Sequence, residues 1–540
     1  MSFRLFNLVL GKNNEMKSLF VFVLIFCTFH SIGQVPEPAV LSLKVFAGDG
    51  GDQIVPYVTQ SADGGSIIHL GTTSLTGPIT DTFCAAEPSF GQAIFVKFNS
   101  DASSRGWYKC RKSSWSDTSY VFMFQTADNN IIIGGMTNSG NKWIIRKEDS
   151  AGNVLWMKAY GGSGSQMLYS MAPTVDGGFV LFGSAYGNDG DIGFHYGSAG
   201  TRDFWVLKID AYGDKQWSKV YGGTGEDIGG SVLLAPDGGY YIIGSTTSTD
   251  NECNDNHGLG DVFVARLDSN GGIVWHRCYG GSGSDGGEVQ GCRAVLNGKG
   301  GVLIAAKTGS SDGDVSHKIN VTGYNFWLLN LSDVGSIIWD NCYGGGGAEI
   351  PSSMCLSING SIWMIGISHL ASGQVNMTYG GSSDAYVVHA DSNGNFLSAK
   401  VLGSSGQDVG YMICPLSDGS VLAGGYYGAG DGVFPSTLFG SAPDAFLVRL
   451  SNWPANIDVL SAETSFSVYP NPTTDWINIH SGRSGYARIQ INDAIGREMY
   501  RGVFTNELSL PILDWHKGFY YVHVIDNESQ DSYIQKLIIQ

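Results

Sequence analysis

The chain has 540 residues, too many for one ordinary hydrophobic core, so several domains or a repeat architecture are expected. Its 43% hydrophobic and 15% charged residues exclude a disordered chain, and its 77 glycines follow no G-X-Y period, which excludes collagen. The net charge of −18 repels phosphates, which makes nucleic acid an unfavourable partner.

Residues 1–34 are predicted to be a signal peptide for export. A basic start near Met16, which is itself a possible true start of the protein, precedes an apolar run from Leu19 to Phe29. This run is too short to span a membrane comfortably, and no later stretch is long enough. Cys27 offers an alternative, a lipoprotein signal, although Phe26 stands where a small residue is expected.

Three short patterns recur about every 60 residues along the chain. The first is a Gly- or Asn-containing turn, then three to five apolar residues, then Gly or Ala. Its copies begin at Asp63, Asp128, Asp176, Asp237, Gly298, Asn359 and Asp418. The second is an aromatic residue followed by apolar residues. Its copies begin at Phe95, Trp143, Trp205, Phe263, Trp327, Tyr386 and Phe446.

The third pattern is a strand that usually carries Trp and often ends in Tyr-Gly-Gly. Its copies begin at Trp156, Trp217, Trp275 and Trp339, with weaker copies at Trp107 and Phe396. After the seventh repeat this strand is missing, and a matching stretch, Leu41 to Gly48, stands at the start of the mature chain.

These patterns predict an all-β fold, a seven-bladed β-propeller over residues 39–451. Strands rich in β-branched and aromatic residues are bounded by Gly and Asp turns, and radial stacking buries both faces of each small sheet. Leu41 to Gly48 would complete the last blade and close the ring. An open β-solenoid or separate β-sandwiches are the alternatives, but a solenoid coil usually repeats at about 20–30 residues.

The repeats resemble the Gly-rich propellers of exported Bacteroidetes proteins. The copies most similar to that pattern are Trp217 to Asp227, Asp237 to Gly244, and Asp203 to Asp210. The resemblance implies a fold and a secretion habit, and it implies no single activity.

We label the four strands of one repeat A to D in chain order. The loops between strands B and C are long, whereas the A–B and C–D turns are short. The long loops cover residues 72–93, 184–203, 245–261, 306–325, 367–385 and 426–445. Long loops on a rigid scaffold often carry binding sites, so a glycan or protein ligand is expected on this face.

Two of these loops hold weak candidates for a metal site. They are Asp189, Asp191 and His195 in one loop, and Asp312, Asp314 and His317 in the other. Calcium bound by oxygens and imidazole is one interpretation, but the spacing does not match an EF-hand. Asx-turns and hydrogen bonds within the loops are the favoured interpretation, so no cofactor is predicted.

The cysteines predict disulfides Cys278–Cys292 and Cys342–Cys355, because the two pairs occupy nearly equivalent places with similar spacing. Export into an oxidising compartment favours such bonds, each stabilising by about 2–3 kcal/mol. Four further cysteines, Cys84, Cys110, Cys253 and Cys414, have no predicted partner.

No nucleophile elbow, P-loop or HExxH motif is present, so no catalytic residue is predicted. The repeated Trp residues are expected to pack between blades rather than to bind sugars. A secreted or surface binding protein of adhesion type is the favoured function. The alternative is a secreted polysaccharide- or protein-degrading enzyme at the channel mouth, distinguished by buried acidic or His side chains with shifted pKa there.

Residues 452–464 are predicted to be a linker and residues 465–540 a small Ig-like antiparallel β-sandwich, since alternating strands follow one another there. This part closely resembles the type A sorting domain of the type IX secretion system. The matching residues include Tyr469, Pro470, Asn471, Pro472, Gly496, Gly518, Tyr520 and Lys536. The resemblance implies a Bacteroidetes origin, contact with the type IX machinery and export through the periplasm to the outside. A carbohydrate-binding sandwich is the alternative.

Overall fold

The structure, a computed structural model, describes much of the chain from Pro38 to Ile539. The described residues are 38–46, 54–60, 66–72, 92–98, 105–112, 118–126, 128–137, 142–149, 153–198, 200–287, 292–319, 323–375, 377–434, 443–454, 466–469, 473, 475–481, 486–493, 498–515, 518–526 and 532–539. They are almost entirely strands, with one short 3-10 helix, η1 (Asn251–Cys253), which confirms the all-β prediction. The predicted signal peptide lies outside the described residues.

Residues 38–454 form antiparallel sheets, most of which are built from four consecutive strands. The first three sheets are β2 (Ile54–Gln60), β3 (Ser66–Thr72), β4 (Gln92–Phe98) and β5 (Arg105–Lys112); β6 (Thr118–Gln125), β7 (Ile131–Thr137), β8 (Trp143–Glu148) and β9 (Val154–Tyr160); and β10 (Gln166–Pro173), β11 (Phe179–Ala185), β12 (Asp203–Ile209) and β13 (Lys215–Tyr221).

The next three sheets continue along the chain, and the fifth has its inner strand in two pieces, β18 and β19. They are β14 (Asp227–Leu234), β15 (Tyr240–Thr246), β16 (Asp261–Leu267) and β17 (Ile273–Tyr279); β18 (Asp285–Gly286), β19 (Arg293–Leu296), β20 (Val302–Thr308), β21 (Asn325–Leu331) and β22 (Ile337–Tyr343); and β23 (Ile350–Leu356), β24 (Ile362–Ser368), β25 (Asp384–Ala390) and β26 (Phe396–Leu402).

The last sheet of this part joins the two ends of the repeat region. It contains β27 (Val409–Pro415), β28 (Val421–Tyr427), β29 (Asp444–Pro454) and, as the outer strand, β1 (Pro38–Phe46) from the start of the described chain. The strands β1 and β29 are antiparallel, with Leu43 opposite Val448. The prediction that the start of the chain completes the last sheet is therefore confirmed.

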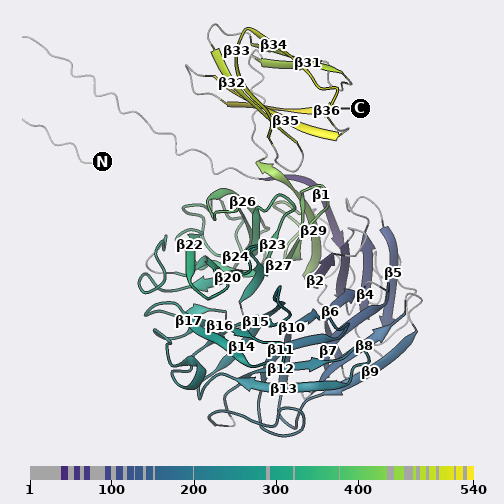
Figure 1. Cartoon of the computed structure of the whole chain (residues 1–540), viewed down its shortest axis with the longest axis vertical. Helices are drawn as coiled ribbons and strands as arrows, with labels where there is room; N and C mark the ends of the chain where they lie inside the picture. Colours follow the sequence, from purple (N-terminus) through teal and green to yellow (C-terminus); the bar gives the residue numbers. More distant parts are fainter. Residues whose placement is uncertain are drawn as a thin grey trace, which may run out of the picture. The chain divides into compact units, whose positions relative to one another are not determined.

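The inner strands of the sheets contact one another in succession, as Figure 1 shows for β2, β6, β10, β14, β23 and β27. The contacts run from β2 through β6, β10, β14, β19 and β23 to β27, and β27 in turn contacts β2. The outer strands β5, β9, β13 and β17 lie at the rim (Figure 1). A succession of contacts that returns to its start is the arrangement of a propeller.

The Tyr and Trp residues of the third pattern join each sheet to the next. The hydroxyl of Tyr343 at the end of β22 donates to the carbonyl oxygen of Gly394 in the following sheet at 2.5 Å. A Cβ added at Gly394 would lie 2.6 Å from the ring of Trp339, so the indole packs on that turn. The same arrangement recurs at Gly213, Gly271 and Gly335 with Trp156, Trp217 and Trp275. The predicted packing of these Trp residues between blades is confirmed.

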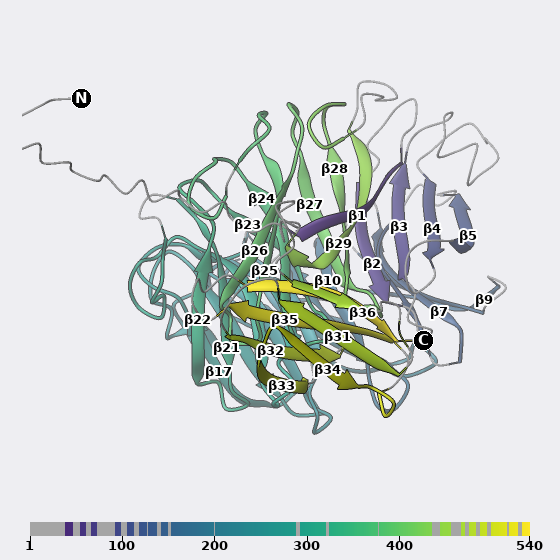
Figure 2. The ribbon, with the colours of Figure 1, turned by 90° about the horizontal axis from the view of Figure 1, so that it is seen from above.

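Residues 466–539 form a separate antiparallel arrangement of two sheets, whose strands can be followed in Figure 2. One sheet contains β30 (Phe466–Tyr469), β31 (Trp476–Ser481) and β34 (Glu507–Pro511); the other has the order β33 (Glu498–Thr505), β32 (Tyr486–Asp493), β35 (Gly518–Asp526) and β36 (Ser532–Ile539). One cluster of buried residues, including Ile479, Ile491 and Val522, contains side chains of both sheets. This agrees with the predicted sandwich.

No helix among the described residues is both long and apolar enough to cross a membrane.

Candidate functional site

The channel between the inner strands contains a cavity of about 340 Å³. Its walls come from β6, β10, β14, β19, β23 and β27, the inner strands of six successive sheets. The cavity therefore belongs to the ring as a whole, and the long loops between the second and third strands of each sheet contribute no lining residue in the described part. Its volume is within the lower range of small-molecule sites.

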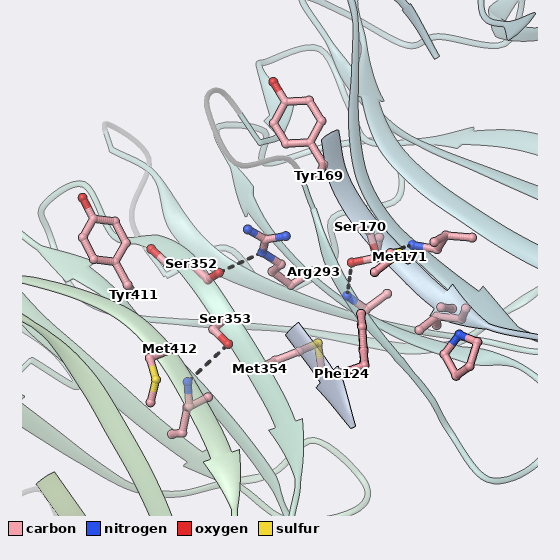
Figure 3. Close-up of a pocket in the computed structure, with 17 residues that line it drawn as sticks. Phe124, Tyr169, Ser170, Met171, Arg293, Ser352, Ser353, Met354, Tyr411 and Met412 are labelled. Carbon is pink, nitrogen blue, oxygen red and sulfur yellow. Dashed lines mark hydrogen bonds between the residues drawn. The ribbon is translucent and has the colours of Figure 1, made fainter. Parts of the chain in front are cut away.

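Polar and apolar side chains are mixed in the lining of this channel pocket. Figure 3 shows the Arg293 guanidinium and the rings of Tyr169 and Tyr411, and it shows Ser353 beside Met354. The pocket thus offers a cation, two phenol rings, hydroxyls and apolar side chains.

Serine residues on the inner strands link neighbouring sheets around this pocket. The Oγ atoms of Ser170, Ser231 and Ser353 accept hydrogen bonds from backbone N–H groups of the next inner strand, at 3.0, 3.0 and 3.3 Å. At the fifth sheet Arg293 makes the link instead, because its Nε donates to the carbonyl oxygen of Ser352 at 2.9 Å (Figure 3). One position of the repeat therefore exchanges a hydroxyl for a guanidinium.

A β-bulge occurs in the inner strands that carry the pocket. The register of β10 shifts between Leu168 and Ser170, and that of β27 shifts between Gly410 and Met412. Tyr169 and Tyr411 are the extra residues at these shifts. A bulge redirects a side chain out of the regular alternation, which explains why two large polar rings reach the pocket from strands that also contribute to the core.

The described lining of the channel pocket carries one charged side chain and several polar ones. Arg293 is the one charged side chain among its described lining residues, which include no carboxylate and no imidazole. Burial raises the pKa of Tyr169, so its phenol stays protonated at neutral pH. The phenol oxygen of Tyr169 accepts from Nη1 of Arg202 at 3.4 Å, and Arg202 is paired with Glu226.

The carboxylates predicted as weak metal ligands accept hydrogen bonds from backbone turns. Asp189 and Asp312 accept hydrogen bonds from the backbone N–H groups of Ser163 and Ser282, both at 2.8 Å. These donors lie in the Gly-rich turns that lead into the inner strands. The favoured interpretation as loop hydrogen bonding agrees with these contacts.

The other four metal candidates have separate partners. Asp191 accepts from the backbone of Gly161 at 3.0 Å and from Lys215 at 2.6 Å, and Asp314 accepts from the backbone of Gly280 at 3.2 Å. The imidazole of His195 bonds to the carbonyl of Thr201 at 2.8 Å, and that of His317 bonds to the hydroxyl of Ser316 at 2.6 Å. In the described part of the chain no group of three or more His, Cys, Asp or Glu side chains could hold a metal ion.

The predicted cysteine pairs are corrected by the structure. Cys278 and Cys292 belong to different buried clusters, and so do Cys342 and Cys355, because neighbours in sequence lie in different layers between the sheets. Neither disulfide is formed. The thiol of Cys278 is hydrogen-bonded to that of Cys253, which together with burial raises the pKa of Cys278.

Other described cysteines are also buried in the layers between the sheets. Burial raises the pKa of Cys355, and Cys414 on the adjacent inner strand adds to this effect. Cys292 donates to the carbonyl oxygen of Gly244 at 3.5 Å. Cys84 lies outside the described residues.

Several residues of the predicted sorting motif can be placed in the sandwich. The hydroxyl of Tyr469 donates to Glu507 at 3.0 Å, Tyr520 is buried in the core, and Gly518 and Lys536 are members of the paired strands β35 and β36. The motif residues Pro470, Asn471, Pro472 and Gly496 lie outside the described residues.

Sequence reasoning missed the channel pocket. Its residues lie on the first strand of each repeat, which the patterns define only as the segment before a Gly turn. Placing these segments one under another would put Arg293 at the position of Ser170, Ser231 and Ser353, and that exchange is the signal in the sequence.

Comparison with known proteins identifies the C-terminal part. Residues 467–540 match the family described as the secretion system C-terminal sorting domain. A curated relative, "Regulatory protein FlaEY" of Caulobacter vibrioides, is 28% identical over 149 residues, which is 26% of this chain. The match spans 15% of the length of that protein.

Two solved structures overlap most of the chain at low identity. A puromycin hydrolase has a TM-score of 0.42 and 10% identity, covering 91% of this chain and 62% of its own. An exo-beta-1,3-galactanase from Phanerochaete chrysosporium has a TM-score of 0.29 and 9% identity, covering 92% of this chain and 100% of its own. Identities this low do not carry an activity from those proteins to this chain.

Proposed function

We propose that this chain, which its sorting domain directs through the type IX secretion system to the cell surface or the extracellular space, is a binding protein for an acidic saccharide. The ligand would occupy the channel pocket, with a carboxylate at Arg293. The observation that carries the proposal is the composition of the lining: one guanidinium, two tyrosines and several serines, with no acidic side chain among the described residues.

The chemistry of these side chains suits a sugar that bears a carboxylate. A guanidinium recognises a carboxylate through parallel hydrogen bonds, and this pairing is strengthened where water is displaced. Tyrosine rings present an apolar surface for the face of a sugar and a hydroxyl for its polar edge. The hydroxyls of Ser170 and Ser353 accept from backbone N–H groups, and each carries a hydrogen that can be donated to a ligand.

The same lining supports binding rather than hydrolysis. Glycoside hydrolysis uses a pair of carboxyl groups on either side of the bond that is cleaved. Buried acids with raised pKa do occur in this propeller, but those that we describe lie at the junctions between sheets, and none is among the described lining residues of the pocket.

The proposal is tested by binding of the purified protein to an array that contains uronic-acid oligosaccharides and neutral oligosaccharides of matched length. Retention of the acidic set, lost by about 10–100-fold in the Arg293→Gln variant, is the expected result, because a charge-assisted hydrogen bond contributes about 1.5–3 kcal/mol. Arg277→Gln, on the outer strand β17, is the matched control and should bind as the parent protein does.

Two outcomes would contradict the proposal. Equal retention of neutral and acidic sugars would show that the guanidinium of Arg293 does not recognise a carboxylate on the ligand. Release of new reducing ends from a retained oligosaccharide would favour the alternative, a degrading enzyme.

A further inference from the structure

The junctions between sheets repeat one arrangement of polar side chains outside the channel pocket. At four of these junctions an acid near the start of the inner strand donates its backbone N–H to the carbonyl just before the third strand of the preceding sheet. The bonds are Asp227 to Arg202 at 2.8 Å, Asp285 to Gly260 at 2.7 Å, Glu349 to Tyr324 at 2.9 Å and Asp408 to Ser383 at 2.8 Å. The next residue of the preceding sheet, Asp203, Asp261, Asn325 or Asp384 respectively, is therefore placed beside that acid.

The junction at Asn325 shows what this place requires. Its side-chain oxygen accepts from the backbone of Ile319 at 3.2 Å. Its amide nitrogen donates to Oε2 of Glu349 at 3.0 Å and to the carbonyl oxygen of Gly345 at 3.3 Å. The position thus holds a donor that faces acceptors across the junction.

At the equivalent junction Asp384 replaces the amide by a carboxyl group. One oxygen, Oδ2, accepts from the backbone of Tyr379 at 3.1 Å, as the oxygen of Asn325 does from Ile319. The other, Oδ1, takes the place of the amide nitrogen and is buried with no hydrogen-bond partner. The neighbouring carboxylate of Asp408 is already an acceptor for Ser404 at 2.6 Å and for Gly428 at 3.0 Å.

Asp203 repeats this arrangement beside Asp227. Its Oδ2 accepts from the backbone of Tyr196 at 2.6 Å, and its Oδ1 is buried without a partner. Both Asp203 and Asp384 are 1% exposed. Two ionised carboxylates in contact inside a protein repel each other, and burial penalises both charges, so one of the two is expected to keep its proton.

We infer that Asp203 and Asp384 are neutral carboxylic acids in the folded protein, and that Asp384 donates its O–H to the carboxylate of Asp408 in the next sheet. Each of these junctions therefore contains a proton where the junction at Asn325 contains an amide. The inference concerns the ring itself and is independent of the proposed ligand.

The surrounding charges support this assignment. Burial raises the pKa of Asp384 to about 7, with Asp408 adding to the effect, and raises that of Asp203 to about 8, with Asp227, Glu252 and Glu226 adding to it. The hydrogen bond from the backbone N–H of Tyr196 acts in the opposite direction and lowers the pKa of Asp203.

The junction at Asp261 differs from the other three because a histidine is hydrogen-bonded to its carboxylate. At Asp261 the imidazole of His257 lies 2.7 Å from the carboxylate, so a positive charge is available there and we do not extend the inference to it. The amide nitrogen of Asn325 is a hydrogen-bond donor. It can therefore stand at the place of a carboxyl O–H, but it could not stand at the place of a bound cation.

The sign of the pH dependence follows from the raised pKa. A carboxyl group of the unfolded chain ionises near pH 4, whereas the junction holds its proton to about pH 7 or 8. The folded state therefore binds more protons than the unfolded state between these values. The contribution of the junction is fully present below pH 4 and is lost as the pH rises through about 7 to 8.

The test is thermal unfolding of the full-length protein between pH 5 and pH 8 in the presence of a chelator. The parent protein should lose Tm as the pH rises, and Asp384→Asn should recover about 3–5 °C of that loss because its amide donates at every pH. Over the same pH range the Tm of Asn325→Asp should fall further than that of the parent protein, by a similar number of degrees. The exposed Asp333→Asn serves as the control and should follow the parent protein.

An infrared difference spectrum gives a second measurement that does not depend on stability. The carbonyl band of a protonated carboxyl group at neutral pH should weaken in Asp384→Asn and grow in Asn325→Asp. The inference is overturned if all variants share one pH profile and one carbonyl band. It is also overturned if added calcium raises the Tm of the parent protein at pH 8 but not that of Asp384→Asn, which would assign a cation to the site.

Discussion

The ring of residues 38–454 and the sandwich of residues 466–539 bury their apolar faces in different ways. The ring repeats one junction, in which a Tyr hydroxyl donates to a Gly carbonyl of the next sheet. The pairs are Tyr160 with Gly213, Tyr221 with Gly271, Tyr279 with Gly335 and Tyr343 with Gly394. The sandwich has one cluster of buried side chains, and no contact in it is repeated along the chain. A substitution at one junction of the ring is therefore expected to act locally, whereas a substitution in the core of the sandwich is expected to lower the stability of the whole domain.

The largest effect is expected in the sandwich. Ile491→Ala removes a side chain that is fully buried between the two sheets, and such truncations cost about 2–5 kcal/mol of the free energy of unfolding. A domain of this size has little stability to spare, so the variant should unfold at a lower temperature and accumulate inside the cell. Thermal unfolding and the secreted fraction measure both effects.

Val503→Ala is the matched control for that prediction. Val503 lies in the same domain but is 59% exposed, so its truncation should change the free energy of unfolding by less than about 0.5 kcal/mol. Equal losses for the two variants would contradict a single shared core.

A smaller effect is expected from Gly394→Ala in the ring. Gly394 has a φ of +80°, and an added Cβ would meet Trp339 at 2.6 Å, so strain and a steric clash combine to cost about 2–4 kcal/mol. Gly360→Ala has the same φ but open space around it, and should cost only about 1–2 kcal/mol. The difference between the two melting curves isolates the contact between sheets, and its absence would argue against that contact.

The smallest effect is expected from Tyr343→Phe, which removes one hydroxyl and keeps the ring. The loss should be about 0.5–1.5 kcal/mol, the usual net value of one hydrogen bond. Tyr212→Phe removes a hydroxyl from an exposed turn and is the control. Chemical denaturation resolves a change of this size, and an identical midpoint for both variants would show that the repeated Tyr bond does not stabilise the ring.

The strands, the closing strand and the Trp contacts could be predicted from the sequence because each depends on a local pattern repeated at a fixed distance. Trp339 recurs with the same neighbours in several repeats, so its role could be inferred from any one of them. The sorting domain was recognisable for a similar reason, since its motifs keep their order and spacing.

The remaining features depend on which layer a side chain enters. Spacing along the chain placed Cys278 near Cys292, but successive strands face different neighbouring sheets, and Cys278 lies beside Cys253. Arg293 reaches the pocket because it replaces a serine at one position of the repeat, and Tyr169 reaches it through a β-bulge. Neither feature changes the strand pattern of the sequence. In the sequence Asp384 has the appearance of a turn residue, and only the fold shows that burial, with Asp408 across the junction, raises its pKa.

Closure of the ring by the first described strand, β1, is tested most directly by amide hydrogen exchange of β29. With β1 present, the N–H groups of β29 that face it should be protected. Deletion of residues 38–46 should expose them to rapid exchange and lower the Tm, and an added peptide of that sequence should restore protection. Unchanged exchange and an unchanged Tm after the deletion would contradict the closed ring.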